Sequence, residues 1–198
     1  MYRVFYVVAV LLFLQPQADA AVSVGVSGSN SSSSFGLESN RSTTISASVA
    51  VGFLNFLRLG LTHRRSYEKK SGFKSERITE DLVAYTEFQD DTEAITNSFD
   101  LTAIIYKGLV SPFVFAGVAH RKYFSEVTIR NTIYRSRTTL PLVPNYGIGL
   151  SIRLNRDFSL KLTQTFTPGT KNTVDENGVE QEKKVTDSYS QIGITYQL

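Results

Sequence analysis

The chain has 198 residues, a formal net charge of +3 at pH 7, no cysteine and two histidines. This length suits one domain, and so small a basic excess predicts no nucleic-acid partner. The absence of cysteine excludes disulfides, so hydrogen bonds and packing alone must stabilise the fold.

Residues 1–20 have the parts of a secretory signal peptide: a start with one Arg, an apolar run over 4–14 (VFYVVAVLLFL) and the small-x-small sequence ADA at 18–20. The apolar run covers roughly half of a bilayer core about 30 Å thick, which is too short for a membrane anchor. No later segment is apolar enough for a spanning helix, so insertion would require a closed barrel. We predict a cleaved signal peptide over 1–20 and one exported domain over 21–198.

Eight stretches after residue 20 alternate between apolar and polar side chains with a period of two, which is typical of strands that separate two environments. In the first, Val22, Val24 and Val26 alternate with Ser and Gly. In chain order, the predicted strands are about 21–29, 43–53, 56–68, 97–107, 113–124, 144–154, 158–166 and 187–198.

The fifth stretch is the least regular. We predict that Phe113, Phe115, Gly117, Ala119 and Tyr123 form its apolar face. The other face then carries Val114, Ala116, Val118, His120 and Lys122.

The connections between the predicted strands alternate in length. The short ones lie around 54–55, 108–112 and 155–157, and the long ones are roughly 32–41, 69–95, 125–142 and 167–186. Segment 82–89 (LVAYTEFQ) has a strand-like composition, but neither of its faces is apolar throughout, so we predict an ordered part of the second long loop. The fourth loop is predicted to be a hairpin turning at 175–178 (DENG), and the third a hairpin turning at 130–131.

Tight turns at one end and long loops at the other are typical of bacterial outer-membrane barrels. The non-apolar strand faces are mostly Ser, Thr and Gly with a few charges, which would fill a soluble barrel's core poorly. We therefore predict an all-β fold, an eight-stranded antiparallel up-and-down transmembrane β-barrel with apolar faces toward lipid. Both termini would then lie at the periplasmic, short-turn side. A soluble secreted barrel is the alternative.

Over 21–198 the chain resembles the small outer-membrane barrels typified by the OmpA barrel and OmpX. The resemblance rests on the signal peptide, the eight alternating segments, the unequal connections and a closing strand with Ile192, Ile194, Tyr196 and Leu198. It implies a bacterial outer-membrane location among lipid and lipopolysaccharide, and we expect a monomer. It implies architecture more firmly than activity.

Six polar residues are predicted to form an interior network that fills the barrel and fixes its register. They are Arg58, Asp100, His120, Lys122, Arg153 and Lys161. Because the cations outnumber the anions, a narrow anion-preferring pore is an alternative.

His120 is the one candidate for chemistry, since a set of His120, Ser125 and Glu126 would suit acyl transfer. Some eight-stranded outer-membrane barrels are lipid A deacylases or palmitoyl transferases. The deacylases carry His and Ser two residues apart, whereas here Lys122 stands at that position. Ser125 would be about 16 Å from His120 along a strand. No metal-ligand spacing is present, so we expect no catalytic residue, metal or cofactor.

The charged loops are where surface interactions are expected. Five arginines are candidates for contact with lipopolysaccharide phosphates, the alternative being a solvated collar. They are Arg64, Arg65, Arg130, Arg135 and Arg137. The predicted function is a non-enzymatic outer-membrane protein with a structural or surface-interaction role through four long extracellular loops. The alternatives are a narrow pore or small-ligand transporter, and a lipid A-modifying enzyme.

Overall fold

The computed structural model describes residues 22–35, 38–77, 83–129, 132–174 and 180–198. The predicted signal peptide, the predicted turn at 175–178 and Arg130 lie outside these residues. Within the described ranges, no helix has the length and apolar character required to cross a membrane.

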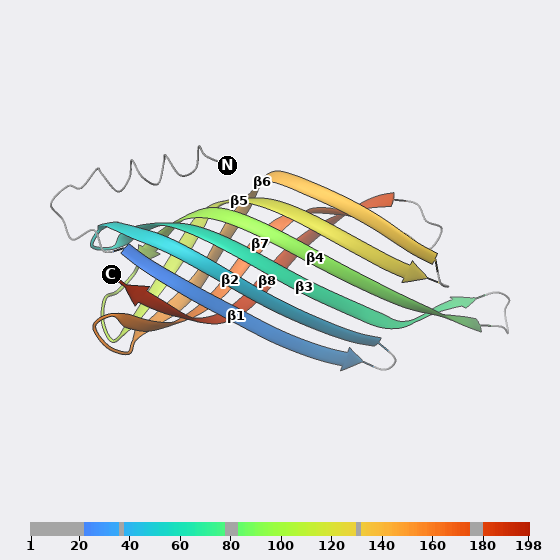
Figure 1. Ribbon diagram of the computed structural model, residues 1–198, viewed down its shortest axis with the longest axis horizontal. Coiled ribbons are helices and arrows are strands. Elements are labelled where there is room, and N and C mark those ends of the chain that lie inside the picture. The colour runs from blue at the N-terminus through green and yellow to red at the C-terminus, as the bar shows by residue number, and fades with distance from the viewer. Residues whose placement is uncertain (1–21, 36–37, 78–82, 130–131, 175–179) are drawn as a thin grey trace.

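The predicted eight-stranded up-and-down barrel is confirmed (Figure 1). The strands are β1 (Val22–Phe35), β2 (Glu38–Leu54), β3 (Leu57–Arg77), β4 (Val83–Ile104), β5 (Val110–Ile129), β6 (Thr132–Arg153), β7 (Phe158–Val174) and β8 (Glu180–Gln197). Each strand pairs antiparallel with the next, and β8 closes the ring on β1. At the end where the short connections lie, which we call the turn end, the amide of Leu198 donates a hydrogen bond to the carbonyl of Val22 (2.8 Å).

The first two long connections are not loops, because strands occupy most of the residues assigned to them. The third and fourth are hairpins as predicted, and in the fourth β7 and β8 stay paired up to Val174 and Glu180. β3 and β4 stay paired up to Arg77 and Val83, so segment 82–89 is largely the start of β4 rather than loop. β5 and β6 remain paired up to Ile129 and Thr132. These parts of the strands have polar residues on both faces, so apolar alternation cannot reveal them, although the backbone ladder forms regardless of side-chain polarity.

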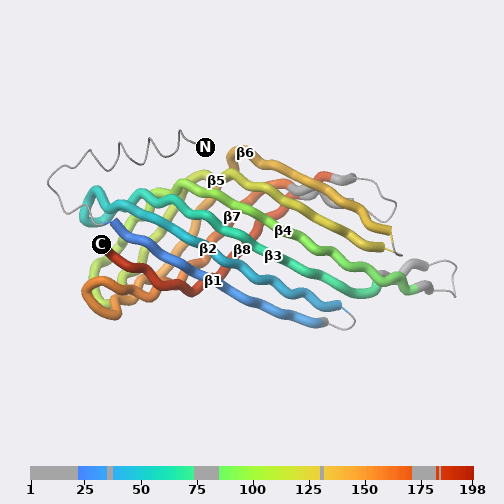
Figure 2. The backbone as a smooth tube through the Cα atoms, in the orientation of Figure 1, coloured from blue at the N-terminus to red at the C-terminus, as the bar shows by residue number. Residues whose placement is uncertain are grey.

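Away from the turn end the barrel divides. β1 and β8 pair only as far as Gly28 and Ile192, and β6 and β7 only as far as Tyr146 and Phe166. Beyond these pairs the strands continue as a curved sheet of β1–β6 and a separate β7–β8 hairpin, which together we call the extension (Figure 2). The protein is therefore a short closed barrel with a long, split extension.

A band of apolar side chains surrounds the closed part of the barrel. One row runs across neighbouring strands through Val49, Leu61, Phe99 and Val118. Val26 is 63% exposed and Ile148 is 58% exposed, and Leu101, Leu150, Ile192 and Ile194 are exposed as well. A continuous exposed apolar belt is stable against lipid and costly in water, so it marks the membrane-spanning zone.

The two faces of β5 are the reverse of the prediction. Phe113 is 4% exposed and lies inside the barrel, whereas Val114 and Val118 point outward. Phe113 and Phe115 stand directly opposite Gly149 and Gly147 of β6. Each ring occupies the space above a residue that has no side chain, and this allows an aromatic ring inside a narrow eight-stranded barrel.

Candidate functional site

A layer of polar side chains crosses the middle of the barrel, and we call it the interior layer. Its members come from six strands and are almost fully buried: Arg64, Asp100, Arg121, Asn145, Thr165, Thr167, Tyr189 and Gln191. A buried polar group is costly unless it has hydrogen-bond partners, so the bonds within the layer decide whether it stabilises the barrel.

Arg121 of β5 is the centre of the layer, with no exposed surface. Its guanidinium donates to the carbonyl of Thr167 (3.3 Å) and to the hydroxyl of Tyr189, and it pairs with the carboxylate of Asp187. Tyr123 donates its hydroxyl to the same carboxylate (2.7 Å). Arg121 therefore links β5 to β7 and β8 across the barrel interior.

Asp100 of β4 accepts hydrogen bonds from Ser98 (2.7 Å) and Asn145 (2.6 Å). The side-chain carbonyl of Asn145 accepts in turn from the hydroxyl of Thr167 (3.0 Å). These hydrogen bonds connect the Asp100 carboxylate to Thr167, whose carbonyl binds Arg121. Because these contacts join four strands, the layer is one connected network rather than a set of isolated pairs.

Arg64 of β3 donates to the hydroxyl of Thr165 (3.3 Å) and lies over the ring of Tyr189, with 4.9 Å from Cζ to the ring centroid. Its Nε and Nη1 atoms are buried without a hydrogen-bond partner. Arg64 therefore brings positive charge that the layer neutralises only in part.

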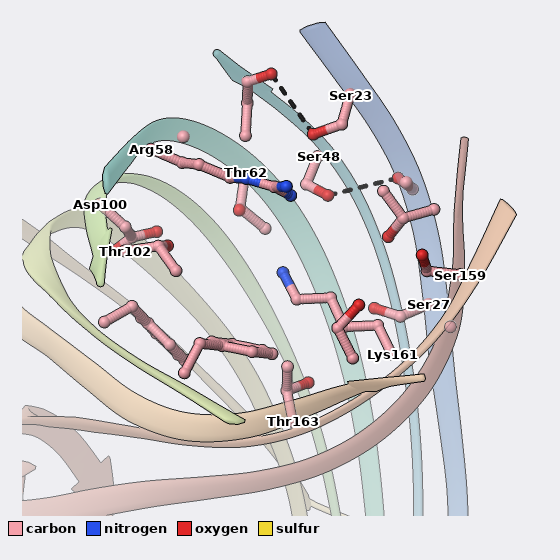
Figure 3. Close-up of a pocket in the computed structure, with 18 of the residues that line it drawn as sticks. Ser23, Ser27, Ser48, Arg58, Thr62, Asp100, Thr102, Ser159, Lys161 and Thr163 are labelled. Carbon is pink, nitrogen blue, oxygen red and sulfur yellow. Dashed lines mark hydrogen bonds between the residues drawn. The ribbon is translucent and has the colours of Figure 1, made fainter. Parts of the chain in front are cut away.

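Between the interior layer and the turn end lies a cavity of about 210 Å³. Five basic residues line it, together with one carboxylate, Asp100. The five are Arg58, Arg64, Lys107, Arg153 and Lys161. Figure 3 shows the side chains of Arg58 and Lys161 pointing into the same space, near the hydroxyls of Ser48 and Thr62.

Four of the six residues predicted for the interior network line this cavity, namely Arg58, Asp100, Arg153 and Lys161. His120 and Lys122 do not belong to it. They lie on the outward face of β5, because Ala119 and Arg121 point inward on either side of His120. The prediction reversed them together with the rest of β5.

The prediction missed Arg121, Tyr123 and Asp187. Arg121 lies on the same face of β5 as Phe113 and Phe115, an even number of residues away. Predicting that this face meets lipid therefore also put the Arg121 guanidinium in lipid. A charged side chain in mid-membrane is costly, and that conflict in the sequence was a usable signal. The glycines opposite the two rings were a second signal.

The set proposed for acyl transfer is not assembled. His120 faces outward, where its Nδ1 lies 3.3 Å from the carbonyl of Pro141. Ser125 faces inward and donates to Asp90 (3.2 Å), while Glu126 faces outward and pairs with Arg135. In the described part of the chain, no three or more His, Asp or Glu side chains are grouped to hold a metal ion.

The outward face of the extension carries a groove of about 670 Å³ across β2–β6. Two adjacent cross-strand rows form it: Arg41, Lys69, Asp91, Glu126 and Arg135, and Thr43, Tyr67, Glu93, Phe124 and Arg137. Arg135 pairs with Glu126 (2.8 Å), and Arg137 lies over the ring of Phe124. The groove combines ion pairs with two aromatic rings on the outward face, those of Tyr67 and Phe124.

Of the arginines predicted to contact lipopolysaccharide, three face outward: Arg65, Arg135 and Arg137. Arg65 is next to the groove and pairs with Glu93 (2.6 Å). Arg64 instead belongs to the interior layer. Adjacent residues of a strand point to opposite faces, so when Arg65 faces outward Arg64 faces inward. The prediction that Arg64 contacts lipopolysaccharide is therefore wrong.

Comparison with known proteins supports the fold. No family model matches the chain, and no curated protein sequence matches it. The N-terminal barrel domain of Pseudomonas aeruginosa OprF aligns at a TM-score of 0.53 and 14% identity, covering 92% of this chain and 100% of that one. Ail of Yersinia pestis aligns at 0.52 and 11%, covering 91% and 100%. Neisserial surface protein A aligns at 0.50 and 15%, covering 93% and 100%. The chain thus has the fold of the small eight-stranded outer-membrane β-barrels that its sequence resembles.

Proposed function

We propose that this protein is a non-enzymatic component of the bacterial outer membrane that acts through the outward surface of its extension. The turn end faces the periplasm and the extension faces the exterior. The groove across β2–β6 carries the proposal, because it joins four basic side chains, two of them paired with carboxylates, to aromatic rings directly beyond the apolar band. Such a surface suits the phosphates and sugars of lipopolysaccharide.

The position of the basic residues along β3 and β5 supports this ligand. Leu61 is the last aliphatic residue on the outward face of β3 before Arg65. Arg65 lies four residues beyond it, a distance of about 13 Å along the strand. Lys122 is four residues beyond Val118 on β5 and occupies the same cross-strand row as Arg65. Arg137 follows in the next row. We expect the phosphates of the surrounding lipid at about this level.

The fold is compatible with recognition of a polyanionic saccharide at the cell surface. One solved structure of Ail is a complex with the heparin analogue sucrose octasulfate, and it aligns with this chain at a TM-score of 0.52 and 12% identity. We therefore include extracellular anionic partners among those that the extension serves.

Replacing both Arg65 and Arg137 with glutamine is expected to weaken binding of purified lipopolysaccharide at least tenfold. Two charge-assisted contacts to phosphate would be lost, while the interior layer is left intact. The measurement is a titration of the detergent-folded protein with lipopolysaccharide, followed by calorimetry at fixed ionic strength.

The matched control replaces Arg156, in the short turn between β6 and β7, with glutamine, for comparison with Arg137→Gln alone. It removes the same charge at the turn end, and it is expected to bind lipopolysaccharide as the wild type does. Equal loss in both variants would reduce the interaction to net charge and would contradict a specific surface.

The interior layer argues against the pore alternative. Arg121, Asn145 and Thr167 fill the cross-section with bonded, fully buried side chains. The protein reconstituted in planar bilayers is therefore expected to carry no steady anion current. A sustained, anion-selective conductance in the wild type would favour the pore instead.

A further inference from the structure

We propose that the cavity between the interior layer and the turn end is a binding pocket for a small tetrahedral oxyanion, either free phosphate or a terminal phosphate monoester. This proposal is independent of the surface function above. The cavity lies on the opposite side of the interior layer from the groove, and no lining residue is shared between them.

The first argument is the charge of the lining. Five basic side chains face one carboxylate, and Asp100 already accepts hydrogen bonds from Ser98 and Asn145. Among the described residues, none of Arg58, Lys161 and Arg153 has an ion-pair partner within 4.0 Å. Like charges that converge in a confined space are unfavourable without a counterion, so this interior favours an anion.

The second argument is the chemistry and direction of the donors. Arg58 of β3 and Lys161 of β7 reach into the same space from different sides of the barrel (Figure 3). A guanidinium offers a planar fork to two oxygens, and an ammonium offers a point charge. The hydroxyls of Thr62 and Thr163 supply further donors around them. A tetrahedral oxyanion, with acceptor oxygens in several directions, matches such a set better than a monatomic ion.

The third argument is the shape of the space. The cavity of about 210 Å³ far exceeds the roughly 10–15 Å³ that one water molecule requires. It begins at Lys107, Arg153 and Gln197, next to the short turns, and ends at Arg64 and Gln191 of the interior layer. It is therefore a blind pocket entered from the turn end rather than part of a conduction path.

The floor of the pocket carries positive charge of its own. Arg64 is 4% exposed, and its Nε and Nη1 atoms lack a hydrogen-bond partner. The low dielectric of the interior strengthens the attraction of this charge for an anion above it. Arg64 thus acts through the field it creates, while Arg58 and Lys161 make the contacts.

The test uses the full exported chain folded in detergent, in chloride buffer at constant ionic strength. Inorganic phosphate and glycerol 3-phosphate are titrated separately, and binding is followed by phosphorus NMR. We expect saturable binding of phosphate, weakened about tenfold or more in Arg58→Met and in Lys161→Met, since each loses a charge-assisted contact. Lys184→Gln, which removes an exposed charge of β8 that lines neither the cavity nor the groove, is the control and should bind within about twofold of the wild type.

The two ligands separate the possible sources. Binding of inorganic phosphate alone assigns a free anion, and binding of both assigns a pocket that also accepts a monoester such as a lipid headgroup. Heat-dependent gel mobility verifies that each variant is folded. If Lys161→Met does not fold, competition of sulfate against phosphate in the wild type replaces it, and sulfate should displace phosphate. No saturable binding, no displacement by sulfate, or equal binding in the wild type, Arg58→Met and Lys161→Met overturns the proposal.

Discussion

Replacing Arg121 with methionine is expected to lower the free energy of unfolding by about 3 kcal/mol, because it removes a fully buried guanidinium from one ion pair and two hydrogen bonds. The variant leaves the Asp187 carboxylate without its cation and the Tyr189 hydroxyl without its donor, while the Tyr123 hydroxyl still donates to Asp187. It also removes the link from β5 to β7 and β8. The measurement is urea unfolding of the protein folded in lipid vesicles, with the folded fraction read from heat-dependent gel mobility.

Lys122→Gln is the matched control for this prediction. Lys122 is the next residue along β5, but it faces outward and lies beyond the apolar band. Its substitution is expected to change stability by no more than about 0.5 kcal/mol. Similar stabilities for Arg121→Met and Lys122→Gln would contradict the assignment of Arg121 to the centre of the interior layer.

The second large effect is expected from Gly147→Ala on β6, a change of one methyl group. A Cβ at this position would lie 2.1 Å from the carbonyl oxygen of Gln164 and 2.6 Å from Cζ of Phe115. The first contact is with backbone on the neighbouring strand, so relief requires the β6–β7 ladder to shift. We expect a loss of about 3 kcal/mol, at the upper end for overpacking, in the same urea titration.

Gly60→Ala on β3 tests whether that loss comes from the close approach rather than from alanine in place of a strand glycine. The nearest atom to a Cβ at Gly60 is Cβ of Ala50, at 3.7 Å, which is an ordinary contact. This variant is expected to match or slightly exceed the wild-type stability, since alanine restricts the unfolded chain. A loss at Gly60 as large as that at Gly147 would refute the packing of the Phe rings against β6.

Apolar alternation was a reliable guide wherever a strand separates lipid from a polar interior. Val22, Val24 and Val26 of β1 identify both the strand and its outward face, because side chains alternate strictly along an extended backbone. The same rule does not detect the extension. Segments such as 69–77 of β3 and 83–95 of β4 carry polar residues on both faces, and their pairing depends on the register set in the closed part of the barrel.

β5 is where local pattern and tertiary structure disagree. Both of its faces contain apolar residues, so alternation alone cannot decide which one meets lipid. The choice depends on β6, whose Gly147 and Gly149 leave room inside for Phe115 and Phe113. The reversal moved His120 and Lys122 outside and brought Arg121 and Tyr123 into the interior layer. One wrong face therefore changed the candidate site more than any error in strand boundaries.

The sequence by itself determined the number of membrane-spanning strands, the positions of the short turns and the apolar band. These follow from a period-two pattern that each strand carries alone. Only the tertiary structure decided the inward face of β5, the length of the extension, the bonding of Arg121 with Asp187, and the convergence of Arg58 and Lys161 on one cavity. These features depend on which residues lie opposite one another across strands far apart in sequence, and register and ring closure set that pairing rather than any local pattern.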